Sequence, residues 1–431
     1  MSIKANLQNR VARHLFSPKR RDGKRRKAER QRQARSAPHV VKYYHELGDP
    51  YSHLMVQVLP EFCRRYDVEL EIHIVAPPPD WAAPDRERLQ SYSRRDAALL
   101  AAKAGLDYLD PQAQPSDDAL LTGNTALLQA VKDGAFLQRA ADIGNAVWGG
   151  HTVEHDSVDI TEVASALTAA AKQRDADGHY LGATLHYAGE WYWGVDRLHY
   201  LESRLCELGA AKSDASEAIF APPNVPSPGA SPADGERPIL HWYLSFRSPY
   251  TGIVAERVKA LADSYDAELK LRYVLPMVMR GMQVPRAKGY YIMSDTVREA
   301  ERLSVPFGKL VDPVGKPVER GYAILHKAIE LGKGYEFVRS FLSGIWAEGL
   351  DAGSDRGLKA ITERAGLAWS DIQPLLGVDH WQADAEANQA EMFSHGIWGV
   401  PSFRIGDTAI WGQDRLWVIE DALIAEQDKT K

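Results

Sequence analysis

The chain carries the same unit twice, and this internal repeat constrains the fold more than any other feature. Residues 43–77 align with residues 242–276 without a gap, at a constant offset of 199 positions. The identical pairs include Pro50/Pro249, Tyr51/Tyr250, Tyr66/Tyr265, Asp67/Asp266, Glu69/Glu268, Leu70/Leu269, Tyr92/Tyr291 and Asp96/Asp295. The ends of the copies also match, because residues 193–198 align with residues 411–416. A repeat of this length indicates two domains of one fold, so differences between the copies point to function.

The composition is that of an ordinary globular protein. Of the 431 residues, 45% are hydrophobic and 26% are charged, and no apolar run is long enough to cross a bilayer. The N-terminus lacks the apolar stretch of a secretory signal. Cys63 and Cys206 are the only cysteines, which excludes a disulfide framework and fits a reducing compartment. We therefore expect a cytoplasmic protein.

Residues 1–37 form a basic arm. Residues 1–38 contain 13 Lys or Arg against Asp22 and Glu29, although the whole chain has a net charge of -6. Because little in the arm can be buried, we expect disorder from about residue 17 to residue 36. One short apolar face is spaced by four residues and consists of Ile3, Leu7, Val11 and Leu15. The arm could touch an anionic membrane weakly, act as a solvated tail or be an organelle transit peptide. Nucleic acid is not expected, because neither domain has a matching basic stripe.

Three segments follow the arm. The first domain is predicted at residues 38–209 and the second at residues 238–426. Residues 210–237 are rich in Ala, Pro and Ser and show no hydrophobic periodicity, which is typical of a linker.

The second domain shows the order of elements most clearly. Residues 239–246 form a mostly apolar run that predicts a buried strand, and residues 268–276 predict a second strand. Between them Ser248-Pro249 predicts a helix start, since Ser is a preferred N-cap and Pro is favoured at the first helical position. A mostly helical middle, two short strands and a last helix follow. The order βαβ, helical insertion, ββα predicts an α/β protein with two tandem thioredoxin-like domains.

Pro401 leads into the third predicted strand, opposite the start of the first helix. In the thioredoxin-like plan this proline follows a cis peptide bond, so we expect Val400-Pro401 to be cis. A cis bond is a minority state, at about 5–6% of X-Pro bonds in folded proteins. It would leave a backbone edge available to a ligand.

The first helix of the second domain begins with Ser248-Pro249-Tyr250-Thr251. Redox members of the thioredoxin-like fold have Cys-x-x-Cys at this position. Because Ser248 and Thr251 carry no sulfur, dithiol exchange is impossible here. Backbone N–H groups and the helix dipole still favour an anion at a helix start. A thiol brought by a ligand would therefore ionise more easily next to Ser248. The alternative is that Ser248 is only a helix cap.

These residues resemble a known family. The segment Ser-Pro-Tyr at residues 248–250, followed by Lys288, Tyr291, Asp295 and Arg298, is similar to 2-hydroxychromene-2-carboxylate isomerases and kappa-class glutathione transferases. Both belong to the wider DsbA-like group. Residues 346–349, 399–403 and 411–416 match further motifs of this family, in order. The resemblance covers almost all of the second domain and reaches the first domain only through the repeat.

The resemblance implies that glutathione is the cofactor. It implies that Ser248 holds the glutathione sulfur as a thiolate and that the backbone of Val400, next to Pro401, pairs with the cysteinyl part. Gln413 and Asp414 would bind the γ-glutamyl end, with Asp414 taking the ammonium group. Lys288 would meet a glycyl or substrate carboxylate. No metal ligand is implied.

Some of these residues have other interpretations. Asp414 could simply cap its helix, and Lys288 could be a solvated charge. Arg298 and Arg415 are treated as structural ion-pair partners and stay outside the predicted site. One family feature is missing, because residues 277–287 contain no Asn where an Asn-x-Pro segment is usual. Gln283 is the available substitute.

The first copy lacks the residues that could do chemistry. Asp49 replaces Ser248, so a carboxylate would face a thiolate and repel it. Thr184 is predicted to replace Pro401, which would remove the cis edge. Cys63 and Cys206 are expected to be ordinary buried residues. We therefore expect a degenerate domain used for packing, for internal pairing with the second domain or as a lid.

The sequence thus predicts a glutathione-dependent isomerase or transferase. Its second partner would be a small, aromatic-derived, carboxylated compound. Two alternatives remain open: a DsbA-like protein without catalysis, acting as a scaffold or binding protein, and a relative of the disulfide oxidoreductases that has lost its Cys-x-x-Cys.

Overall fold

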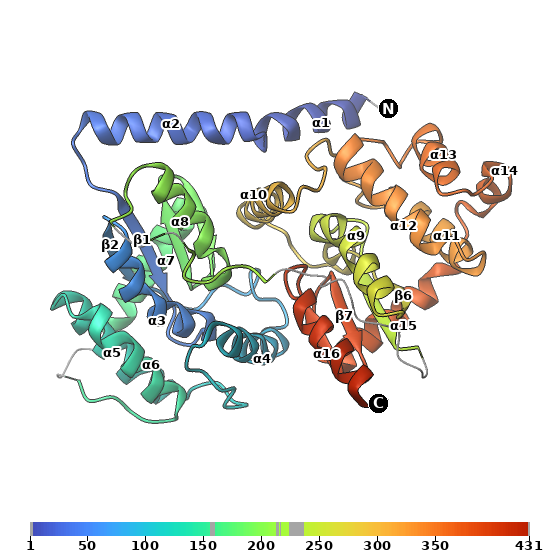
Figure 1. Cartoon of the computed structure of the whole chain (residues 1–431). Coiled ribbons are helices and arrows are strands. Elements are labelled where there is room, and N and C mark those ends of the chain that lie inside the picture. The colour runs from blue at the N-terminus through green and yellow to red at the C-terminus, as the bar shows by residue number, and fades with distance from the viewer. Residues whose placement is uncertain (1–2, 156–159, 213–214, 216, 224–236, 430–431) are drawn as a thin grey trace. The chain divides into compact units, whose positions relative to one another are not determined.

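A computed structural model of the chain describes residues 3–155, 160–212, 215, 217–223 and 237–429 (Figure 1). The chain divides into two compact units. The N-terminal unit comprises Gly23–Pro222 and Pro285–Tyr291, and the C-terminal unit comprises Met1–Asp22, Pro223–Val284 and Ile292–Lys431. The division after Pro222 falls inside the predicted linker, most of which lies outside the described residues.

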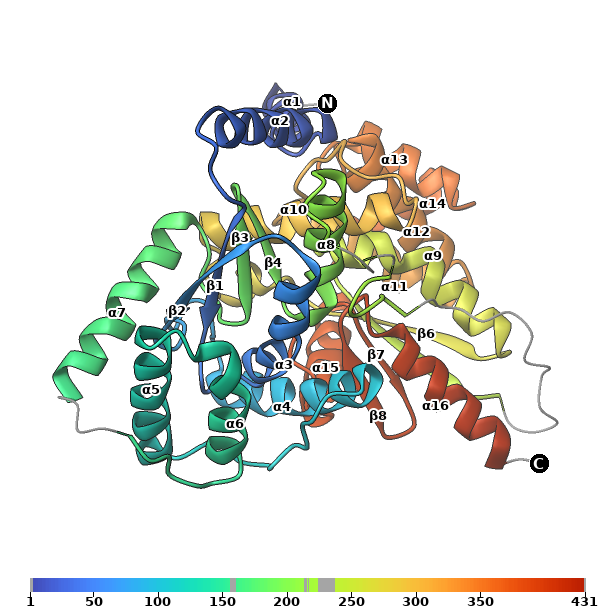
Figure 2. The same ribbon diagram turned by 60° about the vertical axis from the view of Figure 1, so that its left-hand side comes forward.

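The N-terminal unit contains one four-stranded sheet and its helices. Its elements are β1 (Val40–His45), α3 (Pro50–Arg65), β2 (Glu69–Ile74), α4 (Arg86–Ala104), α5 (Asp117–Lys132), α6 (Phe136–Trp148), α7 (Ile160–Asp177), β3 (Thr184–Tyr187), β4 (Glu190–Trp193), the 3-10 turn η1 (Val195–Arg197) and α8 (Leu198–Glu207). Helices α5 and α6 lie side by side in Figure 2.

The C-terminal unit repeats this plan with a longer helical insertion. Its elements are β5 (Ile239–Leu244), α9 (Pro249–Ser264), β6 (Glu268–Tyr273), η2 (Met277–Arg280), α10 (Arg286–Arg302), α11 (Lys316–Glu330), α12 (Gly334–Ser343), the π-helical turn η3 (Gly344–Glu348), α13 (Asp355–Arg364), α14 (Trp369–Ile372), η4 (Gln373–Leu375), α15 (Trp381–Ser394), β7 (Ser402–Ile405), β8 (Thr408–Trp411) and α16 (Leu416–Lys429).

The two sheets have the same strand order. They run β2-β1-β3-β4 and β6-β5-β7-β8. In each sheet the first two strands of the chain pair in parallel, and the other pairs are antiparallel. The predicted α/β fold class and its order βαβ, helical insertion, ββα are confirmed.

Equivalent hydrogen bonds support the alignment of the two copies. Tyr51 Oη donates to Asp96 at 2.8 Å in the N-terminal unit, and Tyr250 Oη donates to Asp295 at 2.9 Å in the C-terminal unit. In both units this bond joins the first turn of the first helix to the first helix of the insertion. The offset of 199 therefore holds in α9 and α10.

The basic arm is helical where the sequence predicts disorder. Its helices are α1 (Ile3–Leu15) and α2 (Pro18–Ala34). Arg25 donates two hydrogen bonds of 2.7 Å to Glu190, and Arg32 pairs with Glu29. The prediction failed because carboxylates pair with cations of α2, and Glu190 lies 165 residues from its partner Arg25. Val11 and Leu15 are exposed, and the side chains of Ile3 and Leu7 lie outside the described part.

Neither cysteine forms a disulfide. Cys63 is half-buried on α3, but Cys206 on α8 is exposed, so the expectation that both are buried was wrong for Cys206. Cys206 lies near the C-terminal end of α8, where Sγ contacts Tyr66 Oη at 3.8 Å. Among the described residues, no helix combines the length and apolar character needed to cross a membrane.

Candidate functional site

Ser248 begins the first helix of the C-terminal unit. Its backbone is extended, with φ -86° and ψ 115°, and Oγ accepts a hydrogen bond from the N–H of Thr251 at 3.2 Å. Pro249 occupies the first helical position because its fixed φ suits a helix and its missing N–H costs nothing there. The predicted helix start is confirmed, and Ser248 is indeed a helix cap.

Ser248 also faces the loop before β7. Its hydroxyl donates a hydrogen bond of 3.2 Å to the carbonyl of Val400. The Val400-Pro401 peptide bond is cis, as predicted. Both Ser248 and Val400 are half-buried, whereas Pro401 is buried. The helix start and the cis-proline loop thus meet at one hydroxyl group.

Thr251 occupies the place of the second cysteine in redox members of this fold. It is fully buried, and within the described residues its Oγ1 makes no hydrogen bond. No sulfur is present at this helix start. The groups that can act on a ligand there are a serine hydroxyl and the positive end of the α9 dipole, both of which favour an anion.

Aromatic side chains pack against the first turn of α9. Trp346 in the π-helical turn donates Nε1–H to the carbonyl of Phe246 at 3.2 Å. A Cβ on Gly252 would lie 2.9 Å from the Trp346 ring, so only glycine allows this close approach. Phe307 stacks on Trp346 with a centroid distance of 5.8 Å. This packing places the π-helical turn directly against the first turn of α9.

An ion pair next to Ser248 was missed by the sequence reasoning. Arg247 donates hydrogen bonds of 2.9 Å from Nε and Nη2 to the two carboxylate oxygens of Asp312. The bidentate pair ties the β5–α9 loop to the loop before α11. No local sequence pattern could have found it, because the partners lie 65 residues apart.

Gln413 lies in the turn before α16, and its side-chain amide is hydrogen-bonded within the unit. Gln413 is 2% exposed. Its Oε1 accepts from Arg257 Nη2 on α9, and its Nε2 donates to Glu299 on α10 at 2.7 Å. Arg257 and Glu299 were not among the predicted site residues. Gln413 therefore connects three elements of the unit instead of presenting an amide to solvent.

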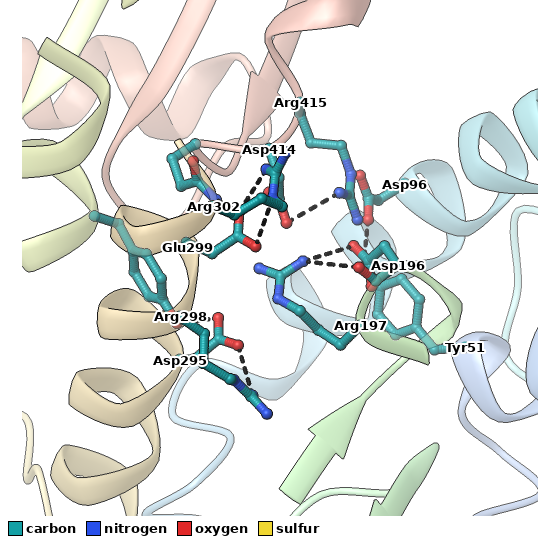
Figure 3. Close-up of polar contacts among 12 residues, drawn as sticks. Tyr51, Asp96, Asp196, Arg197, Asp295, Arg298, Glu299, Arg302, Asp414 and Arg415 are labelled. Atoms are coloured by element: carbon teal, nitrogen blue, oxygen red, sulfur yellow. Dashed lines mark hydrogen bonds and ion pairs between the residues drawn. The ribbon is translucent and has the colours of Figure 1, made fainter. Parts of the chain in front are cut away.

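Asp414 follows in the same turn and is partly buried. Arg415 lies 3.3 Å from its carboxylate. On α10, Arg298 pairs with Asp295 at 2.9 Å and Arg302 pairs with Glu299 at 3.0 Å (Figure 3). Burial lowers the pKa of Arg257 to about 10, although the negative charges of Glu299 and Asp414 act to raise it. Charged groups of α9, α10 and the turn therefore act on one another.

Lys288 belongs to the N-terminal unit, because residues 285–291 at the start of α10 pack there. It is 8% exposed, so it is not a solvated charge. Its Nζ donates to the carbonyl of Ala82 at 3.5 Å. Burial lowers the Lys288 pKa to about 8. Gln283 is exposed in the segment before α10.

The equivalent position in the N-terminal unit is filled by its own side chains. Asp49 caps α3 and accepts hydrogen bonds from the backbone N–H groups of Tyr51 and Ser52. Ser52, the counterpart of Thr251, donates Oγ–H to Asp49 at 3.0 Å. Burial raises the Asp49 pKa to about 6 and the pKa of its neighbour Glu46 to about 8. A carboxylate thus occupies the place of the C-terminal unit's hydroxyl.

Ala183, and not Thr184, is the counterpart of Pro401. Thr184 pairs with Trp193 across β3 and β4, as Ser402 pairs with Trp411 across β7 and β8. The prediction was therefore wrong by one residue. Ala183 donates its N–H to Ser52 Oγ at 2.8 Å, a bond that proline cannot make. The N-terminal unit thus has a backbone N–H bonded to Ser52 at the position where the C-terminal unit has the cis-proline nitrogen.

Comparison with known proteins supports the predicted fold. Residues 239–424 match the DSBA-like thioredoxin domain. Residues 239–424 form a DsbA-like thioredoxin domain. This domain is 21% identical over 194 residues to a 2-hydroxychromene-2-carboxylate isomerase of Pseudomonas sp. (strain C18), covering 43% of this chain and 90% of that protein. It is also 21% identical over 193 residues to the enzyme of that name from Pseudomonas putida, covering 43% and 94% of the two chains.

Solved structures similar to the DsbA-like domain include two proteins of different description. One is a 2-hydroxychromene-2-carboxylate isomerase, with 21% identity, a TM-score of 0.38 and coverage of 44% of this chain and 98% of that one. The other is the cytosolic disulfide reductase DsbM from Pseudomonas aeruginosa, with 15% identity, a TM-score of 0.35 and coverage of 44% and 97%.

Proposed function

We propose that the DsbA-like domain is a glutathione-dependent isomerase or transferase whose substrate is a small, aromatic-derived carboxylate. The observation that carries this proposal is the hydrogen bond from Ser248 to Val400, which places a hydroxyl between a helix start and a cis-proline loop. The two relatives named 2-hydroxychromene-2-carboxylate isomerase support the class of substrate.

The chemistry of the donors at residue 248 fits a thiolate. A thiol with a pKa near 8.5 must drop by about two units, or roughly 2.7 kcal/mol, to be mostly ionised at neutral pH. A hydrogen bond to a charged group contributes about 1.5–3 kcal/mol, and a helix N-terminus contributes about 0.3–1 kcal/mol. The Ser248 hydroxyl and the start of α9 can together supply the required amount.

Bound glutathione would supply a sulfur nucleophile that adds reversibly to a conjugated carbon, which is a route to isomerisation or to transfer. Ser248 would turn its hydroxyl proton from the Val400 carbonyl to the sulfur and hold the negative charge there. The backbone of Val400 would pair with the peptide part of the ligand as one strand edge pairs with another. Asp414 would hold the ammonium of the γ-glutamyl end.

A specific observation favours a second function, a DsbA-like binding protein without catalysis. Gln413 has both polar atoms in internal hydrogen bonds, and the Lys288 amine is buried against the carbonyl of Ala82. Two residues that the family resemblance assigns to ligands therefore already have partners within the chain. The disulfide oxidoreductase alternative has less support, because Ser248 and Thr251 carry no sulfur.

Calorimetric titration of the whole chain with glutathione separates these functions. The isomerase or transferase proposal expects binding, together with the ultraviolet absorbance of a thiolate at neutral pH. Titration with S-methylglutathione is the control, since it has the same peptide but no ionisable sulfur. The absence of heat at millimolar glutathione would refute the proposal and leave the binding-protein function.

A further inference from the structure

In the C-terminal unit a buried polar network links helices α9 and α10 to the turn before α16. Arg257 on α9 donates Nη2–H to Gln413 Oε1, and Gln413 donates Nε2–H to Glu299 on α10 at 2.7 Å. Glu299 is 1% exposed and Gln413 is 2% exposed. The network therefore joins the helix that begins at Ser248 to the turn that carries Asp414.

The N-terminal unit has apolar residues at the same three positions. The offset of 199, which the Tyr51–Asp96 and Tyr250–Asp295 bonds support, makes Val58 and Leu100 the counterparts of Arg257 and Glu299. The strand register makes Val195 the counterpart of Gln413. The exposed fractions of Val58, Leu100 and Val195 are 5%, 1% and 2%. The N-terminal unit thus has buried apolar side chains at the positions of all three network residues.

Burying the polar network of the C-terminal unit should stabilise the fold less than burying the apolar residues of the N-terminal unit. Burial lowers the pKa of Arg257 to about 10, which shows that its charge is poorly solvated. Within the described residues, Arg257 Nε is buried and makes no hydrogen bond. Well-packed apolar residues of similar volume can often replace a buried charged network without loss of stability. Packing alone therefore does not explain the network.

The network acts on the turn that the proposed ligand site uses. Gly412 has φ 124°, a conformation suited to glycine, and Asp414 and Arg415 follow it. Hydrogen bonds from two helices hold Gln413 between Gly412 and Asp414, so the turn has little freedom. Asp414 also interacts favourably with the Arg257 charge. A fixed turn would present its carboxylate and N–H groups in one geometry.

We propose that Arg257, Glu299 and Gln413 are positioning residues that hold the turn of residues 412–415 in the shape that recognises a zwitterionic α-amino-acid end of a ligand. The inference rests on the proposed function, in which that end is the γ-glutamyl group of glutathione. The three residues act through the turn and do not need to touch the ligand. The N-terminal unit, with apolar residues at these positions, would lack this recognition.

The test replaces the three network residues with the apolar residues of the N-terminal unit. The variant is the whole chain with the substitutions Arg257→Val, Glu299→Leu and Gln413→Val. Wild type and variant are titrated with glutathione and with the dipeptide Cys-Gly, which lacks the γ-glutamyl group. We expect the variant to melt at the wild-type temperature or above, to bind glutathione at least tenfold more weakly and to bind Cys-Gly as before. The preference for glutathione over Cys-Gly is the readout that a purely structural role would not change.

Two further variants keep the test decisive. Should the triple variant fail to fold, Gln413→Met removes both hydrogen bonds with little change in volume, and we expect the same loss of preference. Arg298→Met is the matched control, because it breaks an ion pair on α10 outside the network and should lower stability without changing the preference. A triple or Gln413→Met variant that keeps the wild-type preference overturns the inference alone. A wild type that binds neither peptide overturns the proposed function and this inference with it.

Discussion

Ser248 and Val400 are joined by a hydrogen bond although 152 residues separate them in the chain. The serine hydroxyl donates to the carbonyl that precedes the cis-proline, and the same oxygen accepts the N–H of Thr251. One side chain therefore caps a helix and bonds to the cis-proline loop. In the N-terminal unit these two tasks belong to Asp49 and Ser52.

Replacing Ser248 tests whether it does more than cap the helix. We expect Ser248→Ala to lower turnover by a factor of ten or more. Each factor of ten corresponds to a rise of about 1.4 kcal/mol in the activation free energy. Loss of the cap should cost about 1 kcal/mol of stability, whereas Ser248→Gly should cost only a few tenths and still lose activity. Turnover and thermal melting are measured together. Wild-type turnover in Ser248→Gly would show that the hydroxyl is only a cap.

The matched control for Ser248 is Asp49 in the N-terminal unit. Asn at position 49 can still cap α3, so Asp49→Asn should fold normally. We expect its turnover to stay within a factor of two of wild type, because that unit takes no part in the proposed chemistry. A tenfold loss would contradict the division of labour between the units.

Lys288 should make stability depend on pH in alkaline solution. Its pKa is about 8 in the folded chain against 10.5 for an ordinary lysine, so the unfolded chain binds more protons between these values. Stability should therefore rise with pH across that window, and the charged amine should cost about 3 kcal/mol at neutral pH. Lys288→Met should be more stable at pH 7 and should show a smaller rise. Denaturant unfolding of both proteins across the window measures the difference, and parallel curves would contradict the burial of a charged lysine.

Glu46 should have the opposite effect. Burial raises its pKa from 4.5 to about 8, so the unfolded chain loses this proton first as the pH rises. Stability should consequently fall with pH between those two values. Glu46→Gln cannot ionise but can still accept a hydrogen bond, so its melting temperature should match wild type in acid and exceed it above pH 8. Equal melting temperatures at both ends would show that Glu46 ionises normally.

Features that depend on neighbours in the sequence could be predicted from the sequence. The start of α9 follows from Ser248-Pro249, because capping and the fixed φ of proline are local properties. The two-domain α/β plan follows from the repeat and from runs of apolar residues with the spacing of strands and helices. The position of the cis-proline loop follows from the same plan, so Pro401 could be placed opposite Ser248.

Features that depend on distant neighbours were missed or misplaced. Thr184 was misplaced as the counterpart of Pro401, because the offset of 218 that relates residues 193–198 to residues 411–416 leads back to Ala183, and strand pairing shows that Ala183 is correct. Helix α2 was predicted to be disordered because its partner Glu190 lies 165 residues from Arg25.

The sequence by itself determined the repeated fold, the loss of both redox sulfurs and the helix start at Ser248, since each is set by residue type and short-range spacing. Only the tertiary structure decided that Gln413 is held inside a network with Arg257 and Glu299, and that the Lys288 amine is buried against the carbonyl of Ala82. The physical reason is that burial and hydrogen bonding of a side chain depend on which elements fold against it. Those elements lie more than a hundred residues away in the case of Gln413.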